Sequence, residues 1–212
     1  MTTKQENMAD ELAYVRSLAE EGRNAPLVGG LIYVIWGALI GSAALVQYAN
    51  TAGMISLEGA IGWAPWFGAF IFGWVLSFIA GRRARTKFGA RTIGNRTAGA
   101  AWFAVGLFAS GFWITLFLIH DRYTAIGIPD YFLFSLMFPV AFGLYGVAFF
   151  ASATAARLDW LRWFALAAWA FSFATLFLLD SAMQMLVAGV GTFVCALVPG
   201  LILMRREPSD IV

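Results

Sequence analysis

The side chains of this protein best suited to chemistry form a small polar set around its single histidine. His120 and Asp121 are adjacent, while Glu58, Asp130 and Asp180 fall in other short connections between apolar stretches. A histidine beside a carboxylate can change its charge within the physiological pH range, and a histidine with several carboxylates can bind a divalent cation. The set is therefore either a proton or metal sensor or a group of solvated loop residues.

A second set of residues is cationic and lies within residues 82–97. This segment contains no acid, and its cations are Arg82, Arg83, Arg85, Lys87, Arg91 and Arg96. Such a segment attracts anionic lipid headgroups, at about 1 kcal/mol per cation near the surface, and it could also contact a protein partner. Gly89, Gly94 and Asn95 are predicted turn residues whose spacing fits neither common phosphate-binding motif. Binding to nucleic acid is not expected, because only Phe88 lies among the cations.

No ionisable side chain falls at the centre of any long apolar stretch of the chain. Ionisable groups within a membrane usually mark proton relays, ion paths or counter-ions. Cys195 is the only cysteine, so it has no partner for a disulfide within the chain or for a metal cluster. His120 lies at the end of an apolar stretch, where a haem ligand is not expected. We therefore predict a protein that is not an enzyme and has no cofactor.

Six apolar stretches must position these residues. Each is close to the ~20 residues that a helix needs to cross ~30 Å of hydrocarbon. The chain is 61% hydrophobic and 12% charged, with a mean hydropathy of +0.76, whereas soluble domains contain about 25% charged residues. We expect an all-α, polytopic integral membrane protein with six transmembrane helices, at about residues 27–49, 60–80, 98–119, 131–152, 160–179 and 183–204.

The distribution of Lys and Arg predicts how these helices are oriented. If successive connections alternate between the two sides of the membrane, every Lys and Arg except Arg122 falls on one side. The positive-inside rule makes that side cytoplasmic. The prediction is a bacterial inner-membrane bundle over residues 27–204, arranged as three antiparallel hairpins. Both termini are then cytoplasmic, including a tail over residues 205–212.

Residues 1–26 are predicted to form a cytoplasmic arm. Met8, Leu12, Val15 and Ala19 fall on one face of a helix, so a short amphipathic helix is expected over residues 7–22. This helix either lies at the membrane interface beneath the bundle or docks a cytoplasmic protein partner. Because the arm is net acidic, it could also pair with the cationic residues 82–97.

Small residues within the spans predict close helix packing. Gly37 and Gly41 form a GxxxG pair, and Gly106 with Ser110 repeats this spacing. Small residues allow helix backbones to approach closely in a membrane. The contact is expected within the monomer, with a homo-oligomer as the alternative.

Prolines and deep tryptophans add two further expectations. Pro139 and Pro199 each remove a backbone hydrogen bond and are predicted to kink the fourth and sixth spans. Kinks at matching places in two hairpins indicate either a cavity or gate, or only the shape of the helices. A deep indole N–H needs an acceptor, and this applies to Trp36, Trp74, Trp102, Trp113 and Trp169.

Two functions follow from these features. The first is a non-enzymatic scaffold, sensor or accessory subunit with a cytoplasmic docking face. The alternative is a channel or facilitator for a small, weakly polar or anionic solute. Its path could be lined by the polar residues of the spans, namely Ser42, Ser77, Ser110, Thr115, Ser135, Ser172, Thr175, Gln184 and Thr192.

A short sequence resemblance bears on the channel alternative. Residues 24–27, Asn-Ala-Pro-Leu, precede the first span and are similar to a motif at this position in the acetate/succinate channel family. They lack the proline that this family carries between Asn and Ala. The later signature of that family is absent from spans five and six, so no family is assigned.

Overall fold

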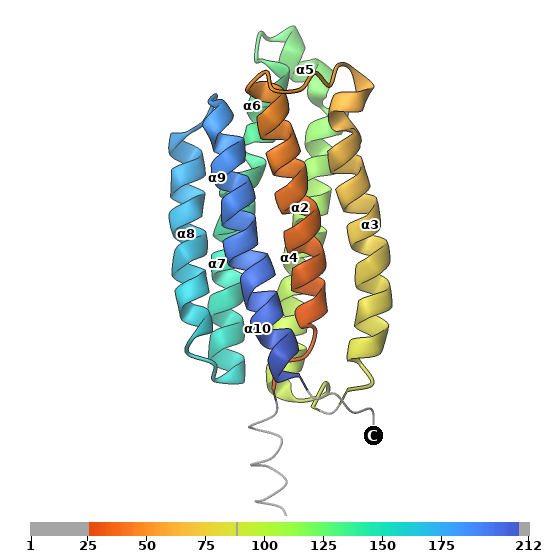
Figure 1. Cartoon of the computed structure of the whole chain (residues 1–212), viewed down its shortest axis with the longest axis vertical. Helices are drawn as coiled ribbons and strands as arrows, with labels where there is room; N and C mark the ends of the chain where they lie inside the picture. Colours follow the sequence, from red (N-terminus) through yellow and green to blue (C-terminus); the bar gives the residue numbers. More distant parts are fainter. Residues whose placement is uncertain (1–25, 88, 208–212) are drawn as a thin grey trace, which may run out of the picture.

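A computed structural model describes residues 26–87 and 89–207, and within these residues every regular element is helical (Figure 1). This confirms the all-α prediction. Five segments are long and apolar enough to cross a membrane, which indicates a multi-pass membrane protein. They are α2 (Gly30–Thr51), α3 (Ala60–Ala84), α4 (Ile93–Leu118), α6 with α7 (Asp130–Ser135 and Met137–Ala156) and the last span, formed by α9, η1 and α10 (Ala182–Thr192, Phe193–Leu197 and Val198–Arg206).

Two shorter helices complete the described chain. The helix α8 (Leu161–Phe177) is apolar but has only 17 residues. The helix α5 (His120–Ala125) lies between α4 and α6 and has 6 residues. The predicted amphipathic helix over residues 7–22 lies outside the described residues.

The helices α3 and α4 both extend into the cationic segment. Arg82 and Arg83 form part of the last turn of α3, where cations interact favourably with the helix dipole. The helix α4 begins at Ile93, so the prediction that Gly94 and Asn95 are turn residues is wrong. The side chain of Thr92 provides the reason, since its hydroxyl caps α4 by accepting a hydrogen bond from Asn95 N at 3.5 Å.

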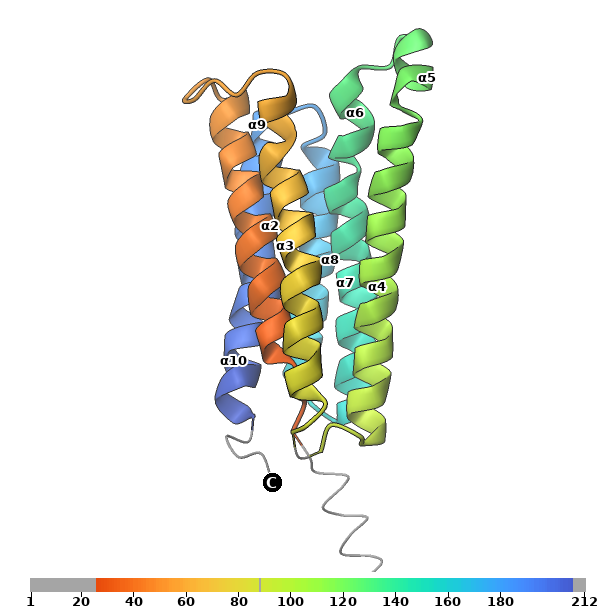
Figure 2. The same cartoon turned by 90° about the vertical axis from the view of Figure 1, so that its right-hand side faces the viewer.

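The helices form a ring that does not close. The helix α3 packs on α2, α2 packs on the last span, and α8, α7 and α4 follow in that order. Figures 1 and 2 show this arrangement from two directions. The helices α3 and α4 are consecutive in sequence, yet they are the two ends of the ring and their backbones hardly approach each other.

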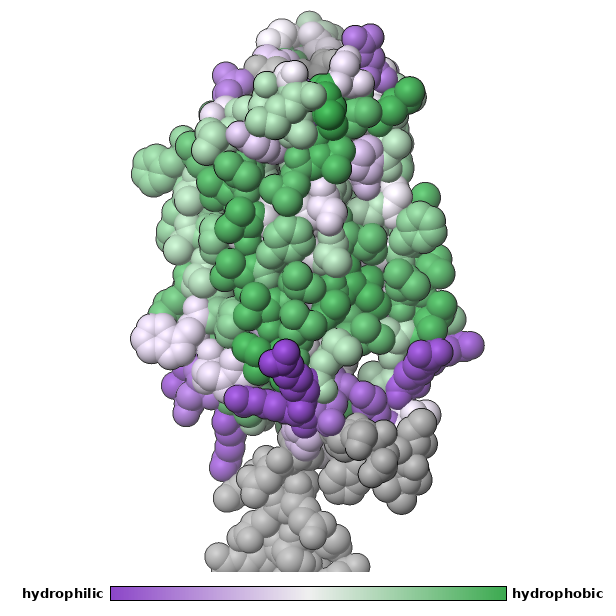
Figure 3. All heavy atoms as spheres, viewed as in Figure 1, coloured by the Kyte–Doolittle hydropathy of each residue, from purple (hydrophilic) through white to green (hydrophobic). Residues whose placement is uncertain are grey.

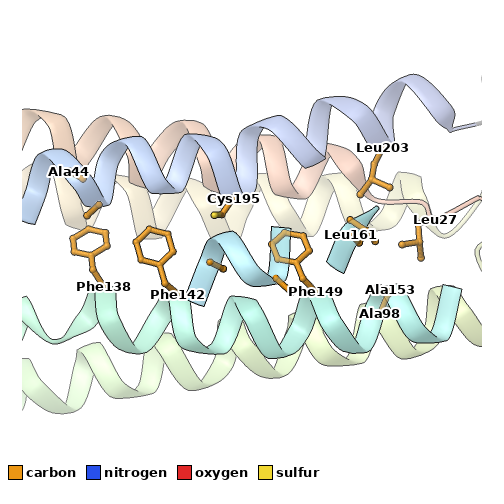
Figure 4. Close-up of a cluster of buried hydrophobic side chains, with 13 residues drawn as sticks. Leu27, Ala44, Ala98, Phe138, Phe142, Phe149, Ala153, Leu161, Cys195 and Leu203 are labelled. Carbon is orange, nitrogen blue, oxygen red and sulfur yellow. The ribbon is translucent and has the colours of Figure 1, made fainter. Parts of the chain in front are cut away.

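The buried core, part of which Figure 4 shows, has no buried member from α3. Phenylalanines of α7 and alanines of α8 belong to this core, and these two helices pack together more extensively than any other pair of the described helices. Cys195 is fully buried within the same core. The principal members are Phe138, Phe142, Phe149, Ala165, Ala168, Ala188 and Cys195.

Glycines of α2 bring the first and last spans together. A Cβ atom on Gly37 would lie 2.5 Å from Leu197 N, and one on Gly41 would lie 2.7 Å from the ring atom Cε1 of Phe193. These two glycines therefore face the last span of the same chain. Gly106 differs, because its nearest neighbour outside α4 is the Trp74 ring, 3.6 Å from a Cβ atom built there.

Both prolines singled out in the sequence lie next to helix irregularities. Pro139 is in the first turn of α7, just after the break at Leu136 that separates α6 from α7. Pro199 is the second residue of α10 and follows the π-helical turn η1. A third proline, Pro65, lies within α3.

The cationic residues are distributed unevenly along the length of the bundle. Every described Lys and Arg except Arg122 lies at the end where α3 finishes and α4 begins, which we call the cationic end. The opposite end, which carries α5, is called the far end. Figure 3 shows a mostly apolar surface between the two, with strongly hydrophilic side chains gathered at the cationic end.

Candidate functional site: an aromatic cleft between α3 and α4

A large cavity occupies the gap between the two ends of the ring. Its volume is about 1540 Å³, and α2, α3, α4, α6 and α7 all contribute to its walls. Typical small-molecule sites measure about 300–1,000 Å³. The cavity therefore has room for a ligand larger than an ordinary metabolite.

The walls of the cavity are mainly aromatic. Trp36 and Trp74 meet edge to face with ring centroids 6.0 Å apart, and Phe70 stacks on Trp113 at 5.2 Å. Such geometries stabilise aromatic pairs beyond the burial of their area. The tryptophans that line the cavity are Trp36, Trp63, Trp66, Trp74, Trp102 and Trp113.

Side chains rather than backbones join α3 to α4 across this cavity. Trp74 Nε1 donates a hydrogen bond to Ser110 Oγ at 3.0 Å, and the rings of Phe67 and Trp113 have centroids 4.9 Å apart. Phe78 on α3 and Phe103 on α4 also line the cavity and are 64% and 61% exposed. The cavity is therefore a cleft that opens at the surface between α3 and α4.

The two ends of the cleft differ in polarity. At the far end, Asn50 holds the connection between α2 and α3, because its Oδ1 accepts from Leu57 N at 2.8 Å. At the cationic end, Arg82, Arg85 and Arg96 line the cleft. No acidic residue of the described chain contributes to its lining.

The structure divides the predicted cationic set into residues at the cleft and residues away from it. All five arginines are exposed, but only Arg82, Arg85 and Arg96 border the cavity; Arg83 and Arg91 do not. Among the described residues, none of these five arginines forms an ion pair with a carboxylate. The guanidinium of Arg82 lies 4.6 Å from the centroid of the Phe78 ring.

Lys87 has a different role, which the sequence did not reveal. Its ammonium group forms an ion pair with Glu207. Glu207 Oε1 also accepts hydrogen bonds from Gly29 N at 2.8 Å and Gly30 N at 2.6 Å, at the start of α2. The carboxylate thus ties the last span to both the first span and the α3–α4 connection.

Asn95 performs a similar task on the other side of this junction. Its side chain accepts from Val28 N at 2.8 Å and donates to Pro26 O at 2.9 Å and Gly89 O at 3.0 Å. The residue is 8% exposed. It fixes the point where the chain enters α2, next to the three arginines of the cleft.

Most polar residues proposed to line a solute path instead bond to backbone carbonyls. Gln184 Nε2 donates to Ser135 O and Thr175 O, both at 2.9 Å. Ser172 Oγ donates to Pro139 O at 2.6 Å. Ser77 is an exception, because it lines the cleft and its buried hydroxyl has no hydrogen-bond partner among the described residues.

The polar set around the histidine is only partly brought together. His120 Nδ1 lies 3.6 Å from Asp121 Oδ1, while Asp180 sits in the turn between α8 and α9 with a φ of 65°. Asp130 begins α6, and Ser56 Oγ donates to Glu58 Oε1 at 3.3 Å. Within the part of the chain that is described, no three potential metal ligands cluster.

Comparisons with protein-family models, with curated proteins and with solved structures each found no match to this chain.

Proposed function

We propose that this chain is a non-enzymatic protein of the bacterial inner membrane that binds a membrane lipid in the cleft between α3 and α4. The observation that carries this proposal is the aromatic, laterally open cavity of about 1540 Å³. Within this proposal, α8 is the sixth span and both termini are cytoplasmic.

The dimensions of the cleft suit an acyl chain. Its lining runs along α3 from Gly62 to Ala84, about 33 Å at ~1.5 Å per residue. The hydrocarbon core of a bilayer is ~30 Å thick. A lipid could enter sideways between α3 and α4 without leaving the membrane, and its chain would then lie against aromatic rings instead of other acyl chains.

The proposed topology rests on helix length and charge. At ~1.5 Å per residue the 17 residues of α8 extend about 26 Å, within the range of short transmembrane helices. With α8 as a span, the N-terminal end of α2 and the C-terminal end of α10 both lie at the cationic end. The positive-inside rule places that end in the cytoplasm.

A lipid-dependent scaffold or sensor is the role that this geometry supports best. An occupant of the cleft would touch both α3 and α4 and so affect how far apart these helices stand. Both helices lead into the short connection at the cationic end, where a cytoplasmic partner could detect the change. Docking of that partner through residues 7–22 remains a prediction, since these residues lie outside the described chain.

A channel or facilitator for a small, weakly polar or anionic solute is the second candidate. One observation favours it, because the cleft reaches from the cationic end to the far end. The aromatic middle of the cleft argues against it, since a polar solute would lose its hydration there and meet few hydrogen-bonding groups.

Native mass spectrometry of the detergent-purified protein tests lipid binding. We expect one retained lipid per chain. Gly106→Phe, which adds a ring facing Trp74 in the cleft, should abolish retention. Gly111→Phe on the same helix is the matched control, because a Cβ atom there has no neighbour within 4 Å and the residue is exposed. Equal retention by the two folded variants, or no lipid on the parent, would contradict the proposal.

A further inference from the structure

We infer that the cleft selects a lipid with an anionic phosphate headgroup and holds that headgroup between Arg82, Arg85 and Arg96. This inference rests on the proposed function and names the chemistry of its ligand. It differs from general attraction of lipid to a cationic surface, because it assigns the selectivity to three of the arginines and leaves the others out.

The charged side chains that line the cleft are all cationic, and they all lie at its cationic end. Arg82, Arg85 and Arg96 line the cavity together with no described acid, and no described carboxylate pairs with any of them. Lys87, the nearby cation in the connection, is already neutralised by Glu207. An anionic headgroup would supply the missing negative charge at this mouth of the cleft.

The chemistry of guanidinium favours phosphate as that anion. Arginine presents a planar fork of N–H donors that matches pairs of phosphate oxygens, and such charge-assisted bonds are stronger than neutral ones. The Arg82 guanidinium rests over the Phe78 ring, 4.6 Å from its centroid. This contact limits the freedom of the side chain at the rim of the cleft while its N–H edges stay available.

Ser77 lies at the level of the cleft where the headgroup region of the bound lipid would end and its acyl chains would begin. It lines the cleft five positions before Arg82 on α3, about 7.5 Å deeper at ~1.5 Å per residue. Its hydroxyl is buried and has no hydrogen-bond partner among the described residues. An ester carbonyl of a glycerolipid with its phosphate at the arginines would provide an acceptor at this level.

The residues at the far end of the cleft indicate how the bound lipid is oriented. The lining at the far end carries the amides Gln47 and Asn50, and it includes no Lys or Arg among the described residues. A headgroup with net negative charge is therefore held at the cationic end, with its chains directed towards the tryptophans.

Lipid titration of the delipidated full-length protein, followed by native mass spectrometry, tests this inference. The probes are dioleoylphosphatidylglycerol and dioleoylphosphatidylcholine, which share acyl chains and differ in net charge. We expect the parent to bind phosphatidylglycerol at least about tenfold more tightly, given three cations at the headgroup. The triple variant Arg82→Gln, Arg85→Gln, Arg96→Gln should lose this preference.

A second triple variant keeps the test specific. It combines Arg83→Gln, Arg91→Gln and Arg205→Gln, which remove the same charge from the same end but lie outside the cleft lining. The preference for phosphatidylglycerol should therefore survive in this variant. Ser77→Ala should weaken binding of both lipids by about threefold, the effect of one lost hydrogen bond.

Two results would overturn the inference while leaving the proposed function intact. One is equal affinity of the parent for both lipids. The other is an equal loss of preference in the two triple variants, which would assign selectivity to the whole cationic surface. Failure of the parent to bind either lipid would instead contradict the proposed function itself.

Discussion

At the scale of single residues, the buried side chain of Gln184 serves a backbone carbonyl that lacks a helical donor. Pro139 has no N–H to offer Ser135 O, the carbonyl four residues before it. Gln184 reaches that oxygen from the last span at 2.9 Å and is 1% exposed. The proline and the glutamine therefore act as a pair, although they belong to different helices.

A double-mutant cycle measures this pairing. Gln184→Leu should lower stability by about 1 kcal/mol, typical of a hydrogen bond between membrane helices. In the Pro139→Ala background the loss should be smaller, because the new N–H can reach Ser135 O. The measurement is thermal unfolding in detergent. Gln47→Leu makes the same chemical change on α2 and should show no coupling to Pro139. Additive effects of Gln184→Leu and Pro139→Ala would rule out the pairing.

Residue-scale contacts were the least predictable from sequence. Gln184 was recognised only as one of several polar residues within spans, and Asn95 was assigned to a turn. Glu207 carried no signal, although its carboxylate joins Lys87 to the start of α2. In each case most partners are backbone atoms distant in sequence, and any residue type provides a backbone N–H or C=O.

At the scale of helices, α2 is the element that holds the ring together. It lies between α3 and the last span, and its glycines leave space for the backbone of that span. The sequence predicted the apolar stretches, because hydrophobic length is a local property of the chain, and five of them are long enough to cross a membrane. Their arrangement as three membrane-spanning hairpins stays a prediction. At the cationic end α3 and α4 continue beyond the predicted spans, which the sequence did not show because arginines at a helix end are also compatible with a loop.

Glycine substitutions test the packing of α2. Gly37→Ala should destabilise the protein by about 1–3 kcal/mol, the usual cost of overpacking, because the added methyl would lie 2.5 Å from Leu197 N. Gly111→Ala on α4 meets nothing within 4 Å and should be neutral or slightly stabilising, since alanine is the better helix former. Thermal unfolding in detergent compares the two. Equal midpoints would show that α2 does not pack on the last span as described.

At the scale of the whole molecule, the open ring is the feature that matters for function. The hairpin pattern predicts that the two helices of each hairpin pack against each other. It does not determine whether the last helix of one hairpin also packs against the first helix of the next. That depends on the side chains between α3 and α4, where six tryptophans line the cavity and the two backbones hardly approach each other. Four of the five tryptophans predicted to lie deep converge on this cleft, and Trp169 does not line it; the convergence could not be read from the sequence.

The proposed six-span topology can be tested by cysteine labelling in intact cells. Cys195 is buried, so it should not react with a membrane-impermeant maleimide. Ser181→Cys, in the turn before α9, should be labelled from outside. Asp159→Cys, in the turn before α8, should be labelled only after permeabilisation. Labelling of both from the same side would mean that α8 does not cross the membrane.

Lipid occupancy of the cleft can be tested directly by photo-crosslinking in membranes with a phosphatidylglycerol that carries a diazirine in its acyl chain. We expect adducts on Val105 and Trp113, which line the cleft and are only 9% and 8% exposed. Phe177, which is 91% exposed, reports on ordinary surrounding lipid. Adducts on Phe177 and similar outer residues, without any on Val105 or Trp113, would contradict the account of this protein as one that holds a lipid between α3 and α4.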